Sequence, residues 1–207
     1  MKFLALCLAL LAAPAMADTA YPALHDVTGV AANDVLNLRA GPDAGAAIIG
    51  SLPPGLAGVE VVGLSDNGKW GRINQSEASG WAAMAYLTPQ AGPAWFTLER
   101  GLRCFGTEPF WTLFIDSDPK TKTAHFLTPE GEGPKMTISA QWPGDDWRPV
   151  AGVQVTSNQG WSIATIRAEA CSDGMSDAVY GLAADIFSKG TTAAPASSLR
   201  GCCTLAP

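Results

Sequence analysis

The 207-residue chain is poor in the residues on which much protein chemistry depends. It has only two histidines, His25 and His125, and no Cys-x-x-Cys pair, so a zinc site of ordinary ligand spacing is not favoured. Its 13 basic and 19 acidic residues give a formal net charge of −6, and no basic stripe is present for nucleic acid or anionic lipid. We therefore expect no metal, no cofactor and no nucleic-acid partner.

Long apolar runs and helical periodicity are also scarce. After residue 17, no apolar run approaches the roughly 18 residues that indicate a membrane-spanning helix, so we expect no transmembrane segment. No stretch beyond the start of the chain sustains a period of about 3.6 residues, whereas short alternating runs separated by Gly, Pro, Asn and Asp recur throughout. These patterns predict an all-β protein.

The first 17 residues have the layout of a cleaved secretory signal. Lys2 precedes an apolar run at residues 3–13, which is followed by Pro14 and the small-x-small triplet Ala-Met-Ala. A run of this length is too short to span a bilayer core of about 30 Å. We predict cleavage after Ala17 and a mature protein that is periplasmic or secreted.

Residues 36–55, LNLRAGPDAGAAIIGSLPPG, are the most informative stretch of the chain. Leu36 and Leu38 alternate with Val35 and Asn37, as a half-buried strand requires. The Gly-Pro-Asp sequence that follows enforces a turn, and the next apolar run ends at Pro-Pro-Gly, a second enforced turn. The stretch therefore predicts two short strands, each ended by a tight turn.

Together with later elements, this stretch resembles the bacterial SH3-like (SH3b) domain. The shared elements are the Leu-Asn-Leu-Arg-x-Gly-Pro opening, a Gly-x-Leu step, a lone Trp at position 70 and the terminal pair Gly80-Trp81. We place this domain at residues 27–88. The resemblance implies a small barrel of five or six strands, usually found in exported proteins that contact the cell wall, but it does not identify the ligand.

Aromatic side chains are the binding candidates in this domain. Trp70, Trp81 and Tyr86 fall where SH3-like barrels place rings between their loops, and stacked rings commonly grip peptides or sugar faces. Arg39, where the first strand of the motif leads into its turn, is the fourth expected binding residue. The alternative interpretation, in which Trp70 or Trp81 belongs to the core, is equally consistent with the sequence.

The second half of the chain also reads as strands and turns. Residues 89–94 contain two prolines and a glycine, which suits a linker, and residues 95–207 are predicted to form a second β domain. Its expected strands are separated by turn formers at the spacing of an antiparallel barrel or sandwich. We place these strands at residues 110–116, 123–127, 135–142, 150–156, 161–168 and 180–187.

Four cysteines follow the signal, namely Cys104, Cys171, Cys202 and Cys203. An even number of cysteines in an exported protein predicts two disulfides, for which three pairings exist. A bridge between the adjacent Cys202 and Cys203 would strain the peptide. We therefore expect Cys104 and Cys171 each to pair with one of the terminal two, which point to opposite faces on a strand. The sequence leaves open which pairs with which.

Two motifs begin at cysteines. CFGTEPFW at residues 104–111 and CSDGMSD at residues 171–177, with the closing Gly-Cys-Cys, resemble the recurring motifs of an uncharacterised bacterial envelope protein family. The resemblance covers residues 103–203 and implies no activity. It places the two motifs in one domain, tied to the same C-terminal strand through their cysteines.

Catalytic interpretations of these motifs are weaker than structural ones. Glu108, Asp173 and Asp177 could form an acid/base or cation site, but capping of turns by the two aspartates and a strand entry at Glu108 are the favoured interpretation. Cys171 could act as a nucleophile only with a histidine base, and no histidine follows His125. We therefore assign no catalytic residue.

The sequence predicts an exported, non-enzymatic and monomeric cell-envelope protein. Its SH3-like domain is expected to bind peptidoglycan or its stem peptides. The first alternative is an envelope hydrolase that uses carboxylates of the C-terminal domain. The second is an inhibitor or assembly partner of another envelope protein.

Overall fold

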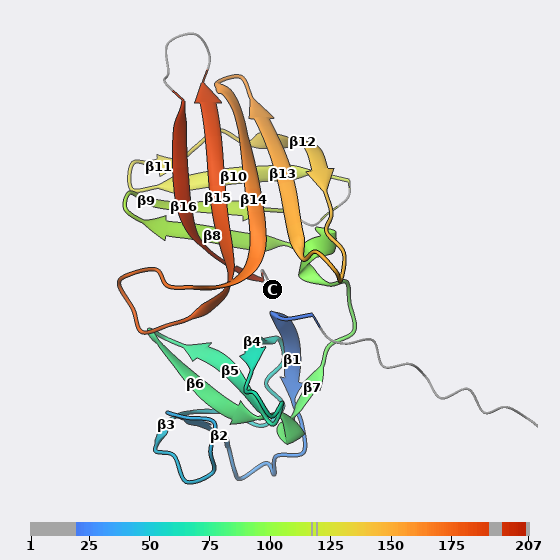
Figure 1. Cartoon of the computed structure of the whole chain (residues 1–207), viewed down its shortest axis with the longest axis vertical. Helices are drawn as coiled ribbons and strands as arrows, with labels where there is room; N and C mark the ends of the chain where they lie inside the picture. The colour runs from blue at the N-terminus through green and yellow to red at the C-terminus, as the bar shows by residue number, and fades with distance from the viewer. Residues whose placement is uncertain (1–19, 117, 119, 191–195, 206–207) are drawn as a thin grey trace, which may run out of the picture.

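The structure is a computed structural model that describes residues 20–116, 118, 120–190 and 196–205. Within these residues the chain forms sixteen β-strands and two 3-10 helices, with no α-helix, arranged in two sheets (Figure 1). The prediction of an all-β fold is therefore confirmed. The predicted signal and its cleavage after Ala17 lie outside the described residues.

The first sheet has seven strands. Their order is β3-β2-β6-β5-β4-β1-β7, and the 3-10 helix η1, Met84–Tyr86, connects β6 to β7. Alternating apolar residues of these strands meet in one buried cluster that includes Leu38, Val61 and Ile73. The strands are β1 Ala23–Val27, β2 Leu36–Arg39, β3 Ile48–Leu52, β4 Val59–Leu64, β5 Trp70–Gln75, β6 Ala78–Ala83 and β7 Leu87–Pro89.

The first strand of this sheet begins before residue 27, where we placed the start of the SH3-like domain. The strand ends at Val27, because Gly29 adopts a φ of 71°, in the left-handed region that interrupts an extended chain. The residues before it form β1, which pairs with β4 on one side and β7 on the other. The lead-in segment is therefore part of the sheet.

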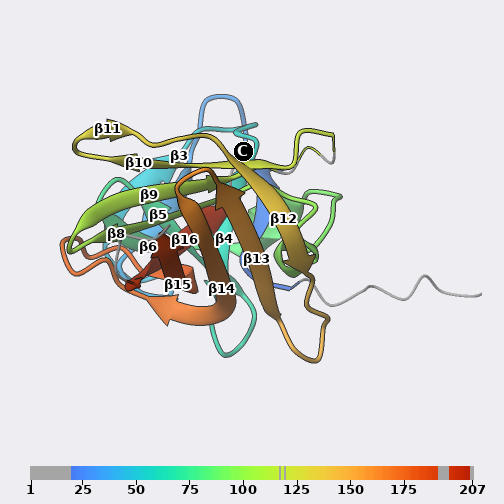
Figure 2. The same ribbon diagram turned by 90° about the horizontal axis from the view of Figure 1, so that it is seen from above.

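The second sheet closes on itself. Its strands are β8 Leu102–Thr107, β9 Phe110–Ile115, β10 Thr123–Thr128, β11 Gly131–Glu132, β12 Met136–Trp142, β13 Val150–Ser157, β14 Gly160–Cys171, β15 Tyr180–Gly190 and β16 Ser197–Leu205. Apart from the short β11, each strand pairs with the next along the chain, and β16 pairs with β8. Eight strands therefore form an antiparallel barrel. In Figure 2, β12 and β13 run at a steep angle to β8, β9 and β10.

The interior of the barrel is apolar, and its end nearest the first sheet is sealed by the 3-10 helix η2, Trp95–Thr97. Trp95 and Phe96 of this helix are buried in the same cluster as Leu102 and Ile186 of the barrel wall. Leu24 of β1 also belongs to this cluster. The first sheet therefore contributes directly to the core of the second.

Polar contacts also join the two sheets. Trp95 Nε1 donates a hydrogen bond to the carbonyl of Tyr21 at 3.2 Å, and the amide of Leu205 donates to a carboxylate oxygen of Glu60 at 3.0 Å. On the neighbouring strands, the Asn74 side-chain amide donates to the carbonyl of Val179 at 3.1 Å. The contact between the sheets is thus both apolar and hydrogen-bonded.

The disulfide prediction is confirmed. Cys104 pairs with Cys203, and Cys171 pairs with Cys202. Cys203 lies directly opposite Cys104 in the register of β16 and β8, while Cys202 faces the other side of the strand. The two bridges therefore attach both cysteine motifs to the C-terminal strand.

Candidate functional site

The exposed face of the seven-stranded sheet brings together residues from β2, β5 and β6. Trp81 lies directly opposite Arg39 on one side and Arg72 on the other, and directly opposed residues share a face. Trp70 is on the same face because it is two residues before Arg72. Ile73, the residue after Arg72, points to the other face and is buried in the core. Burial of one face thus forces the aromatic and basic residues outward.

Three of the four predicted binding residues line one groove of about 380 Å³ on this side of the sheet. We call this the aromatic groove, and it is defined by Arg39, Trp70 and Tyr86. Trp70 and Arg39 are half-buried, whereas Tyr86, which ends η1, is 43% exposed. Neither tryptophan of this face belongs to the buried core. The rings are therefore accessible to a ligand.

Trp81 does not line the aromatic groove. Its ring is half-buried and lies under the guanidinium of Arg72, whose Cζ is 4.7 Å from the ring centroid. This geometry is a cation–π interaction. Trp81 therefore extends the candidate surface from Arg39 towards Arg72.

The groove carries charges of both signs. Arg39 donates from Nη1 to the carbonyl of Ala46 at 2.8 Å, which orients the guanidinium and leaves its other N–H groups for a ligand. Asp34, also in the lining, accepts the amide hydrogen of Val35 at 2.8 Å. A ligand's acidic group can thus bind Arg39 and its amine can bind Asp34. The rings of Trp70 and Tyr86 can contact the apolar part of the ligand.

Sequence reasoning missed two members of this surface. Arg72 could have been found because it is two residues after Trp70 and so shares its face in a strand. Asp34 could not have been found in this way, because it precedes β2 and reaches the groove through a loop.

Asp173, one of the three candidate carboxylates of the second half, is bound by backbone amides of its own turn. Asp173 Oδ1 accepts the amide hydrogens of Met175 and Ser176 at 3.0 and 2.9 Å, which confirms its predicted turn-capping role. Burial alone would raise the pKa of Asp173, but these hydrogen bonds outweigh it and hold the pKa below the usual value. Glu108 and Asp177 are exposed. A general acid of the glycosidase type needs a raised pKa, which Asp173 does not have.

The two cysteine motifs are in contact. Thr107 Oγ1 donates to the carbonyl of Asp173 at 2.7 Å, and the ring of Phe105 meets the ring of Tyr180 edge to face with centroids 4.9 Å apart. Cys171 is held in a disulfide and has no thiol to act as a nucleophile.

Among the described residues, no group of three or more His, Cys, Asp or Glu side chains is placed to hold a metal ion.

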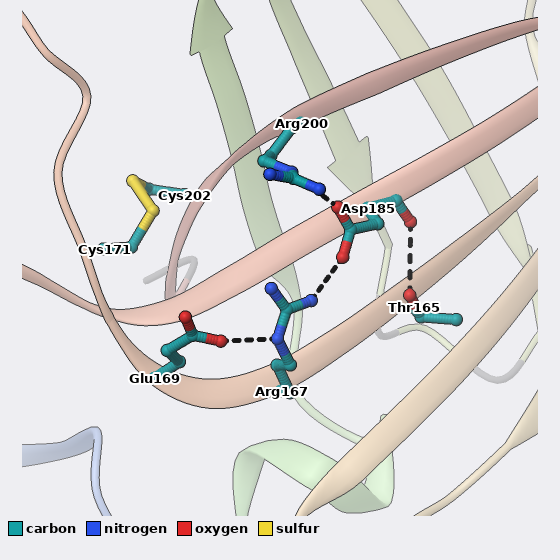
Figure 3. Close-up of polar contacts among 7 residues, drawn as sticks. All are labelled: Thr165, Arg167, Glu169, Cys171, Asp185, Arg200 and Cys202. Carbon is teal, nitrogen blue, oxygen red and sulfur yellow. Dashed lines mark hydrogen bonds and ion pairs between the residues drawn. A yellow bond between two sulfur atoms is a disulfide. The ribbon is translucent and has the colours of Figure 1, made fainter.

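A charged cluster lies on the outer wall of the barrel (Figure 3). Asp185 accepts hydrogen bonds from Arg167 and from Arg200, and Glu169 binds the other side of Arg167. Burial would raise the pKa of Asp185, but the two guanidinium groups outweigh it and lower the pKa. The charges of this cluster are thus paired with one another, and we interpret it as a structural network.

The tryptophans of the second half differ in their exposure to solvent. Trp95 and Trp111 are buried in the barrel, whereas Trp142 and Trp147, on either side of the Pro-Gly-Asp-Asp loop, are exposed. Trp161, at the start of β14, is partly exposed.

The match that the comparisons with known proteins give lies within the first sheet. In the part of the chain that the structure describes, no helix is long and apolar enough to cross a membrane. No curated protein and no solved structure matches the chain. The resemblance of residues 103–203 to an envelope family accordingly stays a prediction. Residues 34–88, which contain Arg39, Trp70, Trp81 and Tyr86, match the family model of the bacterial SH3 domain.

Proposed function

We propose that this chain is an exported cell-envelope protein that binds peptidoglycan through its stem peptides and does not catalyse a reaction. The observation that carries the proposal is the convergence of Arg39, Trp70 and Tyr86 on one groove within the segment that matches the bacterial SH3 domain. Bacterial SH3 domains suggest a role at the cell wall.

The chemistry of the groove suits a short peptide with free charges. The remaining N–H groups of Arg39 pair with a carboxylate of the stem peptide, a charge-assisted contact with geometric specificity. Asp34 accepts an amine of the same peptide, and Trp70 and Tyr86 cover its apolar portion. The cation–π pair of Arg72 and Trp81 adds a second platform at the side of the groove.

Export is supported by the two disulfides. Disulfides persist in oxidising compartments such as the periplasm and the extracellular space, and both bridges here are internal to one domain. The apolar start of the sequence, ending in Ala-Met-Ala, has the layout of a secretory signal. We propose that the mature protein begins at Asp18 and acts as a monomer.

The test is co-sedimentation of the purified mature protein with purified sacculi. Trp70→Ala and Arg39→Ala should each weaken binding at least tenfold, because hot-spot aromatic and arginine residues carry about 2 kcal/mol or more of binding energy. The matched control is Trp147→Ala, which removes a 93% exposed indole from the other sheet and should bind as the unchanged protein does. Normal binding by both groove variants would overturn the proposal.

The Trp81→Ala variant tests the contribution of the Arg72–Trp81 pair separately. Because this ring lies under Arg72 and outside the core, we expect its loss to weaken sacculus binding more than it lowers the melting temperature. Unchanged binding would confine the site to the aromatic groove.

A zymogram on cell-wall material tests the proposal that the protein is not an enzyme. Release of soluble wall fragments by the unchanged protein would overturn that part of the proposal.

A further inference from the structure

The barrel contains a cavity at one end. A cavity of about 630 Å³ lies at the end of the barrel where β13 and β15 finish and where β14 and β16 begin. This end points away from the seven-stranded sheet in Figure 1, and Figure 2 views the protein from that side. We call it the barrel mouth, and it is defined by Phe110, Trp111, Phe126, Met136, Ser162 and Ser188.

The walls of the barrel mouth are mainly aromatic and aliphatic. Trp111 and Phe126 meet edge to face with ring centroids 6.2 Å apart, and Met136 is buried beside them. Phe110 and Trp161 stand at the rim, where both are partly exposed. Such a lining favours an apolar ligand, since apolar surface removed from water is the main source of binding energy in pockets of this kind.

A pair of serine hydroxyl groups lies in the wall of the cavity, whose other uncharged polar side chains are Thr128, Ser157 and Gln159. Ser162 and Ser188 are directly opposed on β14 and β15, and their hydroxyl oxygens are 2.7 Å apart. Ser162 is only 7% exposed. Two hydroxyl groups have two hydrogens, and their mutual bond uses one, so the pair retains one hydrogen for an acceptor in the cavity. An entirely apolar occupant would leave that donor unpaired, at a cost in free energy.

Charge is confined to the rim. Glu130 and Lys189 are the charged residues in the lining, both are exposed, and their charges are opposite. A charged ligand group would have to leave water for an apolar wall without a buried counter-ion, which is unfavourable. The occupant of the barrel mouth is therefore uncharged in the part that enters.

We propose that the barrel mouth binds an uncharged, largely apolar small molecule that carries a hydrogen-bond acceptor. Its rings or aliphatic body pack on Trp111, Phe126 and Met136, and its acceptor receives the free hydroxyl hydrogen of the serine pair. The volume lies within the range of about 300 to 1,000 Å³ that is typical of small-molecule sites. Barrels of about eight strands have an interior wide enough for one such ligand.

This site is separate from the aromatic groove. Its lining residues all come from the barrel strands and the loops that connect them, whereas those of the groove come from the strands and connections of the seven-stranded sheet. Binding at the barrel mouth can therefore be tested without reference to sacculi, and failure of either proposal leaves the other standing.

The first experiment is a fluorescence titration of the purified full mature protein with N-phenyl-1-naphthylamine, an uncharged probe that emits strongly in apolar sites. We expect saturable enhancement, and Phe110→Asp should weaken it at least tenfold by placing a charge at the rim. Phe187→Asp is the matched control, because Phe187 is 53% exposed, against 54% for Phe110, and does not line the cavity. Absence of saturable binding, or equal affinities of the two variants, would overturn the proposal.

The second experiment tests the serine pair. 2-Acetylnaphthalene and 2-ethylnaphthalene share one ring system, but only the ketone has an acceptor, and both are used to displace the probe. We expect the preference for the ketone to fall about fivefold or more in the Ser162→Ala/Ser188→Ala double variant, while 2-ethylnaphthalene binds as well as before. An unchanged preference in a variant that still binds the probe would overturn the assignment of the hydrogen bond.

Discussion

The indole of Trp111 lies over Gly106, its directly opposed partner across β8 and β9. A Cβ atom built on Gly106 would overlap Trp111 Nε1. A Cβ atom built on Gly201 would overlap the carbonyl oxygen of Phe105 and stand 2.8 Å from Trp111 Cζ2. Only residues without a side chain leave room for the ring at these two places. The contact explains why glycine and tryptophan occur together in CFGTEPFW and why the closing motif begins with glycine.

Replacing Gly106 should therefore destabilise the barrel. Gly106→Ala forces the Trp111 ring or the backbone to move, and overpacking of this kind typically costs about 1 to 3 kcal/mol of unfolding free energy. Urea denaturation followed by tryptophan fluorescence measures the change. The matched control is Gly63→Ala on β4, where an added Cβ would meet no atom within 4 Å. Equal stability of the two variants would contradict the role given to Gly106.

Glu60 makes the contact between the two sheets sensitive to pH. Burial raises the pKa of Glu60 from 4.5 to about 7, against the opposing effect of the Leu205 amide, and its Oε1 has no hydrogen-bond partner. Because the folded-state pKa is the higher one, the contribution of Glu60 to stability should be fully present below about pH 4.5 and be lost as the pH rises to about 7.

Glu60→Gln keeps an acceptor for Leu205 but cannot ionise. We expect it to be more stable than the unchanged protein at pH 8, by up to about 3 kcal/mol, since each pKa unit corresponds to about 1.4 kcal/mol. The two proteins should be similar at pH 4. Glu77→Gln, at an exposed position, is the control and should show no such divergence. Parallel stability profiles of Glu60→Gln and the unchanged protein would contradict this prediction.

The disulfide between Cys171 and Cys202 should contribute substantially to the stability of the barrel. It spans a sequence separation of 31, and closing a loop of this length is worth about 3 to 4 kcal/mol in the chain-entropy model. The double variant Cys171→Ser/Cys202→Ser leaves the other bridge intact and should melt at a lower temperature. A reductant, which can open the Cys104–Cys203 bridge as well, should lower the melting temperature of the unchanged protein at least as much. Near-ultraviolet circular dichroism and melting that do not respond to reductant would contradict the prediction.

Asp185 should stabilise the protein above the acidic range. Its pKa is lowered in the folded state by Arg167 and Arg200 against the effect of burial, so its contribution is present above about pH 4 and is lost as the pH falls. Asp185→Asn should cost about 0.5 to 1 kcal/mol at pH 7, because the cluster is only partly buried, and little at pH 2. Thermal melts at both values measure the difference, with Asp66→Asn as the exposed control. A pH-independent loss would show that packing, not charge, is responsible.

The sequence by itself determined the local elements. The alternation around Leu36 and Leu38 and the enforced turns after them predict short strands, and β2 and β3 follow that pattern. Most strands of the second half also agree within a few residues, since side-chain period and turn chemistry act over short distances. The presence of two disulfides was predicted from the even number of cysteines after the predicted signal, and the structure contains both.

Only the tertiary structure decided which strands meet. β1 pairs with β4 and β7, the second of which is about 60 residues further along the chain, and no local pattern encodes that choice. The same long-range pairing places Trp70 in a groove with Tyr86 while Trp81 lies under Arg72. It also brings Ser162 and Ser188 together at the barrel mouth. Sequence indicates which residues face outward, but closure of the sheets determines which of them share a site.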